Sequence, residues 1–163
     1  MIRFKLVTRS EKVSLILHNI RSAYNVGAIF RTADAAGVSR IYLCGYTPTP
    51  NNPKVAKTAL GAEKFVAWER KKQTWRLAGE LKSKGVQVVA LEQTAKSRDY
   101  RLFKPKYPLA IIVGHERQGV SRSILKRVNS VWHIPMRGQK ESLNVAVAAG
   151  IFLYHIAVKI KTK

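Results

Sequence analysis

The segment Ile134-Pro-Met-Arg-Gly-Gln-Lys-Glu-Ser-Leu-Asn-Val145 connects a short apolar run to the most apolar stretch of the chain. The run, Val131–Ile134, has the length and composition of a buried strand. The stretch, Ser142–Ile160, is apolar almost all round, which predicts a long helix buried against a sheet or a second subunit. Ser142 is the expected N-cap, because serine side chains accept hydrogen bonds from the first amides of helices.

Four more apolar runs precede this segment, and their composition is typical of strands buried on both faces of a parallel sheet. They are Val13–Leu17, Arg40–Leu43, Val86–Leu91 and Leu109–Val113. The intervening stretches have helical periodicity, and two of them end at a glycine suited to a helix C-terminus. They are Tyr24–Ala36, Thr74–Lys84 and the short Ser121–Arg127. This alternation predicts an α/β fold with a mostly parallel sheet flanked by helices.

Thr47–Pro53 is the clearest irregular segment, and we expect it to leave the carboxyl end of a strand, where open α/β sheets bind ligands. Repeats, low-complexity tracts and linkers are not evident, so we expect one domain over residues 1–163 with a short basic arm over 1–12. The arm lacks the apolar core of a signal peptide, and no apolar stretch reaches the ~20 residues of a membrane span. We therefore expect a cytoplasmic protein without membrane contact.

The charge of the chain is strongly unbalanced, with 30 Lys and Arg against 9 Asp and Glu and a formal net charge of +21. Such an excess repels itself in a compact chain and indicates a polyanionic partner such as nucleic acid, a basic surface that only aids solubility being the alternative. The basic residues are scattered, which predicts a broad electrostatic footprint. A single cysteine, Cys44, and four histidines without zinc spacing predict neither disulfides nor a metal site.

Three segments combine glycine with polar residues at predicted strand-to-helix junctions: Asn19–Ala33, Gly114–Ser121 and Ile134–Val145. None contains G-x-G-x-x-G, which argues against a dinucleotide site. Gly114–Ser121 has the spacing of a phosphate-binding loop, but Val120 replaces the lysine that an NTPase needs.

Taken in order, N-x-G-A-x-x-R-T-A from Asn25, G-x-E-x-x-G-V-S from Gly114 and I-P-M-x-G-x-x-E-S-L-N-V from Ile134 resemble the three motifs of the SpoU/TrmH family of SPOUT RNA methyltransferases. The resemblance runs from about Val13 to Ile160. It implies transfer of a methyl group from S-adenosyl-L-methionine to a ribose 2′-hydroxyl of tRNA or rRNA, without a metal. It also implies a C-terminal trefoil knot and a homodimer, for which the predicted C-terminal helix offers an interface. With no separate RNA-binding domain expected, the basic surface itself would hold the RNA.

The resemblance also assigns roles to individual residues. The catalytic set is Arg31, Asn25, Glu116, Ser142 and Asn144, and the donor-binding set is Val113, Gly114, Ile134, Met136 and Leu143. Without the motifs, Ile134, Met136 and Leu143 read as ordinary core. The three tryptophans, Trp68, Trp75 and Trp132, could stack on RNA bases, but each adjoins a predicted element, so we expect them in the core.

Arg31 alone would read as a surface arginine paired with Asp34, and the motif instead assigns it the activation of the ribose hydroxyl. Because guanidinium is practically never deprotonated in proteins, a bidentate hold on the adjacent phosphate is easier to defend than general-base catalysis. Asn25 either caps the helix that follows it or orients Arg31 or the ribose. Glu116 is expected to orient the substrate or Asn25 by hydrogen bonds.

Two rival functions stay open on the sequence. One is a non-catalytic RNA-binding or assembly factor on the same fold, and the other is a SPOUT enzyme that methylates a base. The retained Arg31, Asn25, Ser142 and Asn144 argue against the first. The N-x-G-A-x-x-R signature argues against the second, through the resemblance.

Overall fold

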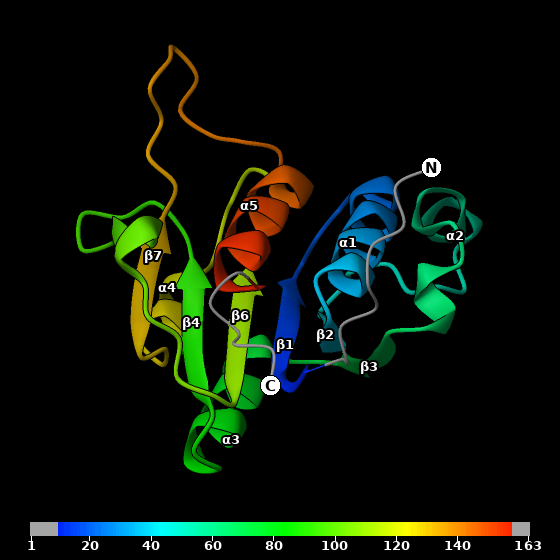
Figure 1. Cartoon of the computed structure of the whole chain (residues 1–163), viewed down its shortest axis with the longest axis horizontal. Coiled ribbons are helices and arrows are strands. Elements are labelled where there is room, and N and C mark those ends of the chain that lie inside the picture. The colour runs from blue at the N-terminus through cyan, green and yellow to red at the C-terminus, as the bar shows by residue number, and fades with distance from the viewer. Residues whose placement is uncertain (1–9, 158–163) are drawn as a thin grey trace.

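The computed structural model describes residues 10–157 and contains one all-parallel sheet of seven strands (Figure 1). The order across the sheet is β3-β2-β1-β6-β4-β7-β5. The strands are β1 Ser10–His18, β2 Val38–Cys44, β3 Ala67–Lys71, β4 Gln87–Leu91, β5 Arg98–Asp99, β6 Leu109–Val113 and β7 Ser130–His133. The helices are α1 Ala23–Ala35, α2 Pro53–Ala59, α3 Thr74–Ser83, α4 Arg122–Leu125 and α5 Val145–Ala157, with 3₁₀ turns η1 Ala62–Lys64 and η2 Tyr100–Leu102.

Helices cover both faces of the sheet, which is why the central strands are apolar without alternation. On β6, Ile111 belongs to the core cluster that α1 and α5 cover, and Ile112 belongs to the cluster beneath α3 and α4. Leu15 and Ile16 of β1 divide in the same way. The strands point the same way, so their carboxyl ends form one edge, at the top in Figure 1. Loops from distant parts of the sequence meet along this edge.

The five predicted strands and the three shorter helices are confirmed, each within a few residues of its predicted bounds. The elements β3, β5 and α2 were not predicted. β3 is a polar edge strand, Ala-Trp-Glu-Arg-Lys, that lacks the apolar pattern of a buried one. The irregular segment ends one residue early: Pro53 begins α2, because the Asn52 side chain caps the helix by accepting from the Lys54 N–H at 3.0 Å and proline suits a first helical position.

The predicted start of the last helix is wrong. α5 begins at Val145, and its N-terminal amides are capped by the Asn144 side chain, so Ser142 lies in the preceding loop instead of serving as N-cap. Residues 158–160, at the predicted end of this helix, and residues 1–9 of the predicted basic arm lie outside the described residues; β1 begins within that arm at Ser10. The trefoil knot stays a prediction from the resemblance.

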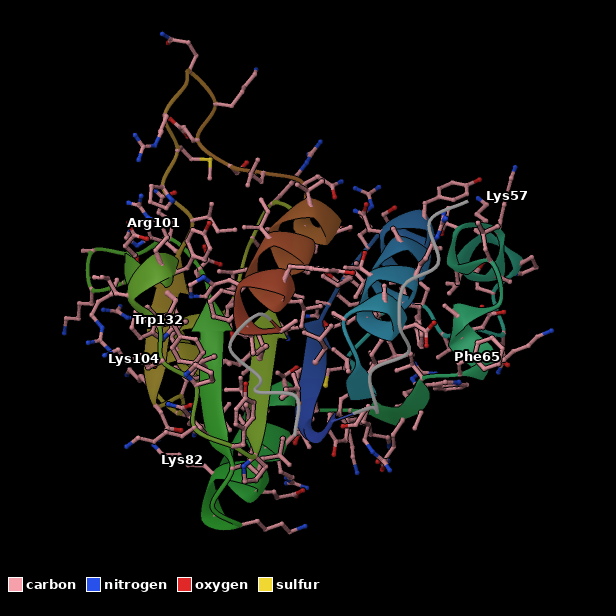
Figure 2. The ribbon with its side chains drawn as sticks, in the orientation of Figure 1. Lys57, Phe65, Lys82, Arg101, Lys104 and Trp132 are labelled. Carbon is pink, nitrogen blue, oxygen red and sulfur yellow. The ribbon has the colours of Figure 1, made fainter. Side chains whose placement is uncertain are left out.

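The tryptophans divide between core and surface. Trp132 is 4% exposed and packs against Phe103 with a ring-centroid distance of 4.9 Å, as predicted for a core residue, and Trp68 is half-buried against the core. The prediction is wrong for Trp75, which is 38% exposed near the start of α3. Figure 2 shows the basic side chains of Lys57, Lys82 and Lys104 pointing outward from widely separated elements, which fits the predicted broad footprint.

The crossing of α1 and α2 depends on the absence of a side chain at Gly27, where a Cβ would lie 2.2 Å from the Val55 carbonyl oxygen and 2.0 Å from Thr58 Oγ1. We expect Gly27→Ala to lower the free energy of unfolding by about 1–3 kcal/mol, measured by urea denaturation. The control is Gly79→Ala in α3, where a Cβ would meet nothing within 4 Å. That change should raise stability by about 0.5–1 kcal/mol through helix propensity. Equal stability of Gly27→Ala and the unmodified chain would contradict this account of the helix crossing.

Candidate functional site

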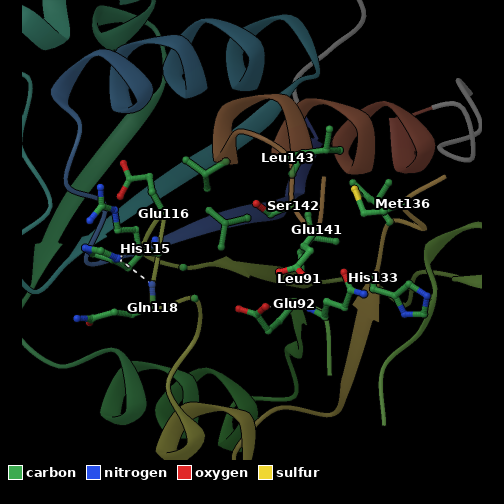
Figure 3. A pocket seen from close by; sticks show the side chains of 18 residues that line it. Leu91, Glu92, His115, Glu116, Gln118, His133, Met136, Glu141, Ser142 and Leu143 are labelled. Carbon is green, nitrogen blue, oxygen red and sulfur yellow. Dashed lines mark hydrogen bonds between the residues drawn. The ribbon is translucent and has the colours of Figure 1, made fainter. Parts of the chain in front are cut away.

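A cleft of about 370 Å³ opens at the carboxyl edge of the sheet, within the range of about 300–1,000 Å³ usual for small-molecule sites (Figure 3). We call it the edge cleft. It lies beyond the ends of β4, β6 and β7, and it is bounded by the 115–119 loop and by the loop that precedes α5. It therefore collects the second and third of the sequence motifs.

All five residues of the predicted donor-binding set line the edge cleft. They are Val113, Gly114, Ile134, Met136 and Leu143. Gly114 must be small, because a Cβ there would lie 2.4 Å from the Gly119 carbonyl carbon across the loop. Leu143 is 39% exposed, and Ile134 and Met136 are only partly buried, so these three apolar side chains are not ordinary core.

A hydrogen-bonded chain of three side chains joins the three motifs beside the cleft; we call it the polar network. Asn25 Nδ2 donates to Glu116 Oε1 at 3.1 Å, and Asn144 Nδ2 donates to Asn25 Oδ1 at 3.0 Å. Asn144 Oδ1 accepts from the N–H of Ala146 at 2.8 Å and of Val147 at 3.3 Å. A carboxylate only accepts and a backbone N–H only donates, so both ends of the chain fix the orientation of both amides.

Glu116 anchors this network to the start of α1. Its Oε2 accepts from the Arg21 N–H and its Oε1 from the Ser22 N–H, both at 2.9 Å. Partial burial alone would raise the pKa of the Glu116 carboxyl, but the backbone N–H groups and the Asn25 amide together hold this pKa below its ordinary value. The carboxyl is therefore ionised at neutral pH. It is suited to orienting Asn25, as predicted, and not to donating a proton.

The structure contradicts one of the two interpretations of Asn25, that of helix N-cap. Ser22 is the N-cap of α1, since its Oγ accepts from the Asn25 N–H at 3.2 Å. The Asn25 side chain is left to bind Glu116 and Asn144. Ser142 lines the edge cleft from the loop before α5 and is exposed.

Arg31 lies apart from the polar network of its own chain. It is exposed on α1 and lines a separate hollow of about 660 Å³, which also contains Lys57, Thr58 and the α5 residue Tyr154. The structure therefore brings together Asn25, Glu116, Ser142 and Asn144 from the predicted catalytic set and places its fifth member elsewhere.

Glu92, at the end of β4, is a cleft residue that was not predicted. Its Oε2 accepts from the Val120 N–H at 2.7 Å, and a Cβ on Gly119 would lie 2.1 Å from the same oxygen. Glu92 thus fastens the 115–119 loop to the sheet. With Glu116 and Glu141, three of the chain's nine acidic residues line this one cleft. An acid directly after a buried strand, in so basic a chain, was the signal that could have identified it.

Two negative observations apply to the described part of the chain. Within residues 10–157, no three His, Cys, Asp or Glu side chains are grouped as a metal ion would require. Among the helices of that same range, none combines the length and apolarity needed to cross a bilayer.

The sequence matches a known family and curated relatives. The model of the SpoU rRNA methylase family matches residues 12–154. The TrmH family protein YacO of Bacillus subtilis (strain 168) is 32% identical over 142 residues, covering 87% of this chain and 57% of that protein. The chain thus spans somewhat more than half the length of the curated relatives it matches.

Solved structures agree with this match. The A. aeolicus TrmH/SpoU tRNA modifying enzyme has a TM-score of 0.86 and 31% identity, covering 94% of this chain and 77% of that one. The AdoMet-bound rRNA methyltransferase from Sinorhizobium meliloti has a TM-score of 0.83 and 28% identity over 95% of this chain and 59% of that one. A structure described as an RNA 2′-O ribose methyltransferase has a TM-score of 0.81 and 26% identity over 96% and 60% of the two chains. With the family model spanning the cleft and the polar network alike, this chain belongs to the SpoU/TrmH family of the SPOUT class.

Proposed function

We propose that this chain transfers a methyl group from S-adenosyl-L-methionine to a ribose 2′-hydroxyl of RNA, either tRNA or rRNA. The observation that carries the proposal is the polar network of Glu116, Asn25 and Asn144, fixed in orientation beside a cleft that contains every predicted donor-binding residue. The family resemblance supports ribose over base, as does the likeness to a solved RNA 2′-O ribose methyltransferase.

The edge cleft fits the methyl donor chemically. Leu91, Met136 and Leu143 offer apolar surface to an adenine ring, and the closely packed backbone at Gly114 and Gly119 leaves peptide groups free of intervening side chains. Glu92 and Glu141 also line the cleft, and their carboxylates complement a ligand that carries a sulfonium and an ammonium group. The AdoMet-bound relative supports this assignment.

The acceptor belongs on the other side of Glu116, in a second hollow of about 480 Å³ that we call the basic hollow. Arg21, Lys54 and Arg117 line it together with Tyr24, which is 45% exposed, and it shares Glu116 with the edge cleft. Cationic side chains of this kind hold the phosphates of RNA. The cations of the basic hollow therefore supply the positive charge that the phosphates of the acceptor RNA require.

When bound, S-adenosyl-L-methionine supplies a methyl group that its sulfonium has already activated. The task of the protein is therefore alignment and the handling of one proton. The polar network holds the start of α1 and the start of α5 at a fixed spacing, which sets the acceptor side against the donor side. In the transfer, the bond between the methyl carbon and sulfur would break as the bond to the 2′-oxygen forms. S-adenosyl-L-homocysteine would leave with the electron pair of the broken bond, and the hydroxyl proton would pass to solvent water.

We place Arg31 in this mechanism through a homodimer. α5 exposes Val147 and Tyr154, at 50% and 49%, on a helix whose other residues are apolar except His155. Tyr154 and Arg31 line the same hollow. A second copy packed on this face of α5 would cover that hollow and bring the arginine against the partner, where its guanidinium can hold the phosphate next to the reacting ribose.

The first test is transfer of labelled methyl from S-adenosyl-L-methionine into tRNA and rRNA transcribed without modifications, followed by alkaline hydrolysis. A 2′-O-methyl group blocks cleavage at the neighbouring phosphate, so we expect the label in alkali-resistant dinucleotides. Label in mononucleotides would instead identify a base methyltransferase. RNA binding without donor binding or transfer would favour the non-catalytic assembly factor.

Arg31→Ala should lower the rate of methyl transfer by at least about 100-fold while donor affinity, measured by calorimetry, stays within about 2-fold. Arg31→Lys should restore little, because an ammonium lacks the paired donors of guanidinium. The matched control is Arg70→Ala, another exposed arginine, on the edge strand β3. Equal losses of donor binding and of transfer would contradict the phosphate-holding role.

Light scattering should give the chain twice its monomer mass of 18.3 kDa. The double change Val147→Glu and Tyr154→Glu should produce a monomer, since it sets charges against the apolar face of α5. Phe65→Glu, at a residue that is 63% exposed on the loop after η1, is the control and should leave the dimer intact. A monomeric unmodified chain would overturn the α5 interface.

A further inference from the structure

A third hollow, of about 330 Å³, is lined by Gln118 and Gly119 at the end of the 115–119 loop, whereas the basic hollow is lined by the residues at the start of that loop, His115 to Arg117. It shares Gln118 and Gly119 with the edge cleft, so only this loop separates the two. We call it the tryptophan hollow, after Trp75 in its wall. The end of β1, the start of α3 and the start of α4 form the remainder of the wall.

Trp75 is exposed and contributes little to the hydrophobic core. The neighbouring α3 residues Thr74, Leu77 and Ala78 are buried, whereas the indole of Trp75 is 38% exposed. An exposed indole forgoes a large part of the stabilisation that burial of an aromatic ring provides. Of the three tryptophans, Trp132 is core and Trp68 is half-buried, so the exposure of Trp75 is a property of this site.

Cations surround the exposed ring. The guanidinium carbon of Arg127 lies 5.0 Å from the ring centroid and that of Arg76 lies 5.5 Å from it, both more distant than the 4.3 Å between Arg98 and the buried Trp132. Lys72 lines the hollow itself. Both arginines are exposed, and neither lies as close to its ring as Arg98 lies to the ring of Trp132.

The remaining lining is neutral and polar. Gln73, Gln118, Ser121 and Ser123 offer donors and acceptors, and none of the described residues that line this hollow is acidic. The edge cleft next to it contains three carboxylates, so the two sites differ in the charge of ligand that they suit. An aromatic face among cations and neutral hydrogen-bonding groups suits an unpaired nucleobase and its phosphate.

We propose that Trp75 is a stacking platform for an unpaired base of single-stranded RNA next to the nucleotide in the reaction site, with Lys72, Arg76 and Arg127 on the adjoining phosphates. This inference rests on the proposed function in one respect, that the ligand is RNA. It does not depend on methyl transfer. It adds a requirement for an unstacked nucleotide beside the modified one, since a base inside a duplex has no free face for the indole.

Tryptophan fluorescence tests the platform directly, because a base stacked on the indole quenches its emission. Titration with an unmodified single-stranded oligoribonucleotide should quench the emission of the protein, and a duplex of the same length should quench it much less. Trp75→Phe keeps an aromatic face, so it should bind the single strand within about 2-fold but lose most of the quenching. Trp75→Ala should weaken binding by about 5- to 150-fold. Phe65→Ala, at an exposed aromatic outside the hollow, should leave both binding and quenching unchanged.

Undiminished RNA affinity in Trp75→Ala, or full quenching in Trp75→Phe, would overturn the platform. Donor affinity, measured by calorimetry, should stay unchanged in both variants and serves as the check that the fold is intact. The two proposals fail separately. If RNA quenches the emission of Trp75 but no ribose is methylated, the proposed function is wrong and the stacking platform stands. If ribose is methylated and Trp75→Ala binds RNA with normal affinity, the stacking platform is wrong and the proposed function stands.

Discussion

The arrangement of the site depends on one ionised carboxylate. Glu116 accepts hydrogen bonds from two backbone amides at the start of α1 and from the Asn25 side chain, which in turn binds the residue that caps α5. Segments more than 90 residues apart in the sequence are thereby held together by bonds whose donors and acceptors cannot be exchanged. An apolar side chain at this position would leave the Arg21, Ser22 and Asn25 donors without this acceptor, so the cost would fall on the positions of both helix starts as well as on a single bond.

The placement of acidic residues follows from the large positive charge. In a chain of net charge +21, an isolated carboxylate experiences an attractive field nearly everywhere, yet three of nine acids converge on one cleft. Three carboxylates and one arginine, Arg117, line the cleft, whereas cations outnumber acids in the basic hollow and in the tryptophan hollow. This arrangement suits the proposed cationic donor inside the cleft and the proposed RNA phosphates outside it, over distances comparable with the screening length of about 8–10 Å at physiological salt. One chain can therefore hold two ligands of opposite charge side by side without either occupying the site of the other.

The sequence was informative where a residue's local pattern and its final environment agree. The strands β1, β2, β4, β6 and β7 are apolar because both faces of the sheet are covered, and α1 and α3 end at glycines with positive φ, Gly37 and Gly85. β3 and β5 lie at the two edges of the sheet, where apolarity is not required, so nothing in their composition distinguished them. The five residues of the predicted donor-binding set line the edge cleft, but the motifs did not predict Glu92. The predicted start of α5 was wrong because Ser142 and Asn144 are both good caps and only tertiary contacts select Asn144. Trp75 was misplaced for a related reason: adjacency to a helix does not say which face of the helix a side chain occupies.

The 115–119 loop is the element that the three cavities share. It contributes to the edge cleft, the basic hollow and the tryptophan hollow, and it is held at one end by Glu116 against α1 and at the other by Glu92 against the Val120 amide. At Gly114, just before the loop, a Cβ would lie 2.4 Å from the Gly119 carbonyl carbon, and Gly119, the last residue of the loop, has a positive φ of 65° that favours glycine. A displacement of the loop would therefore alter the sites proposed for the donor, the acceptor and the flanking base together. For a reaction between an already activated methyl group and a hydroxyl, that shared frame matters more than a strongly basic side chain, because correct orientation alone lowers the barrier by several kcal/mol.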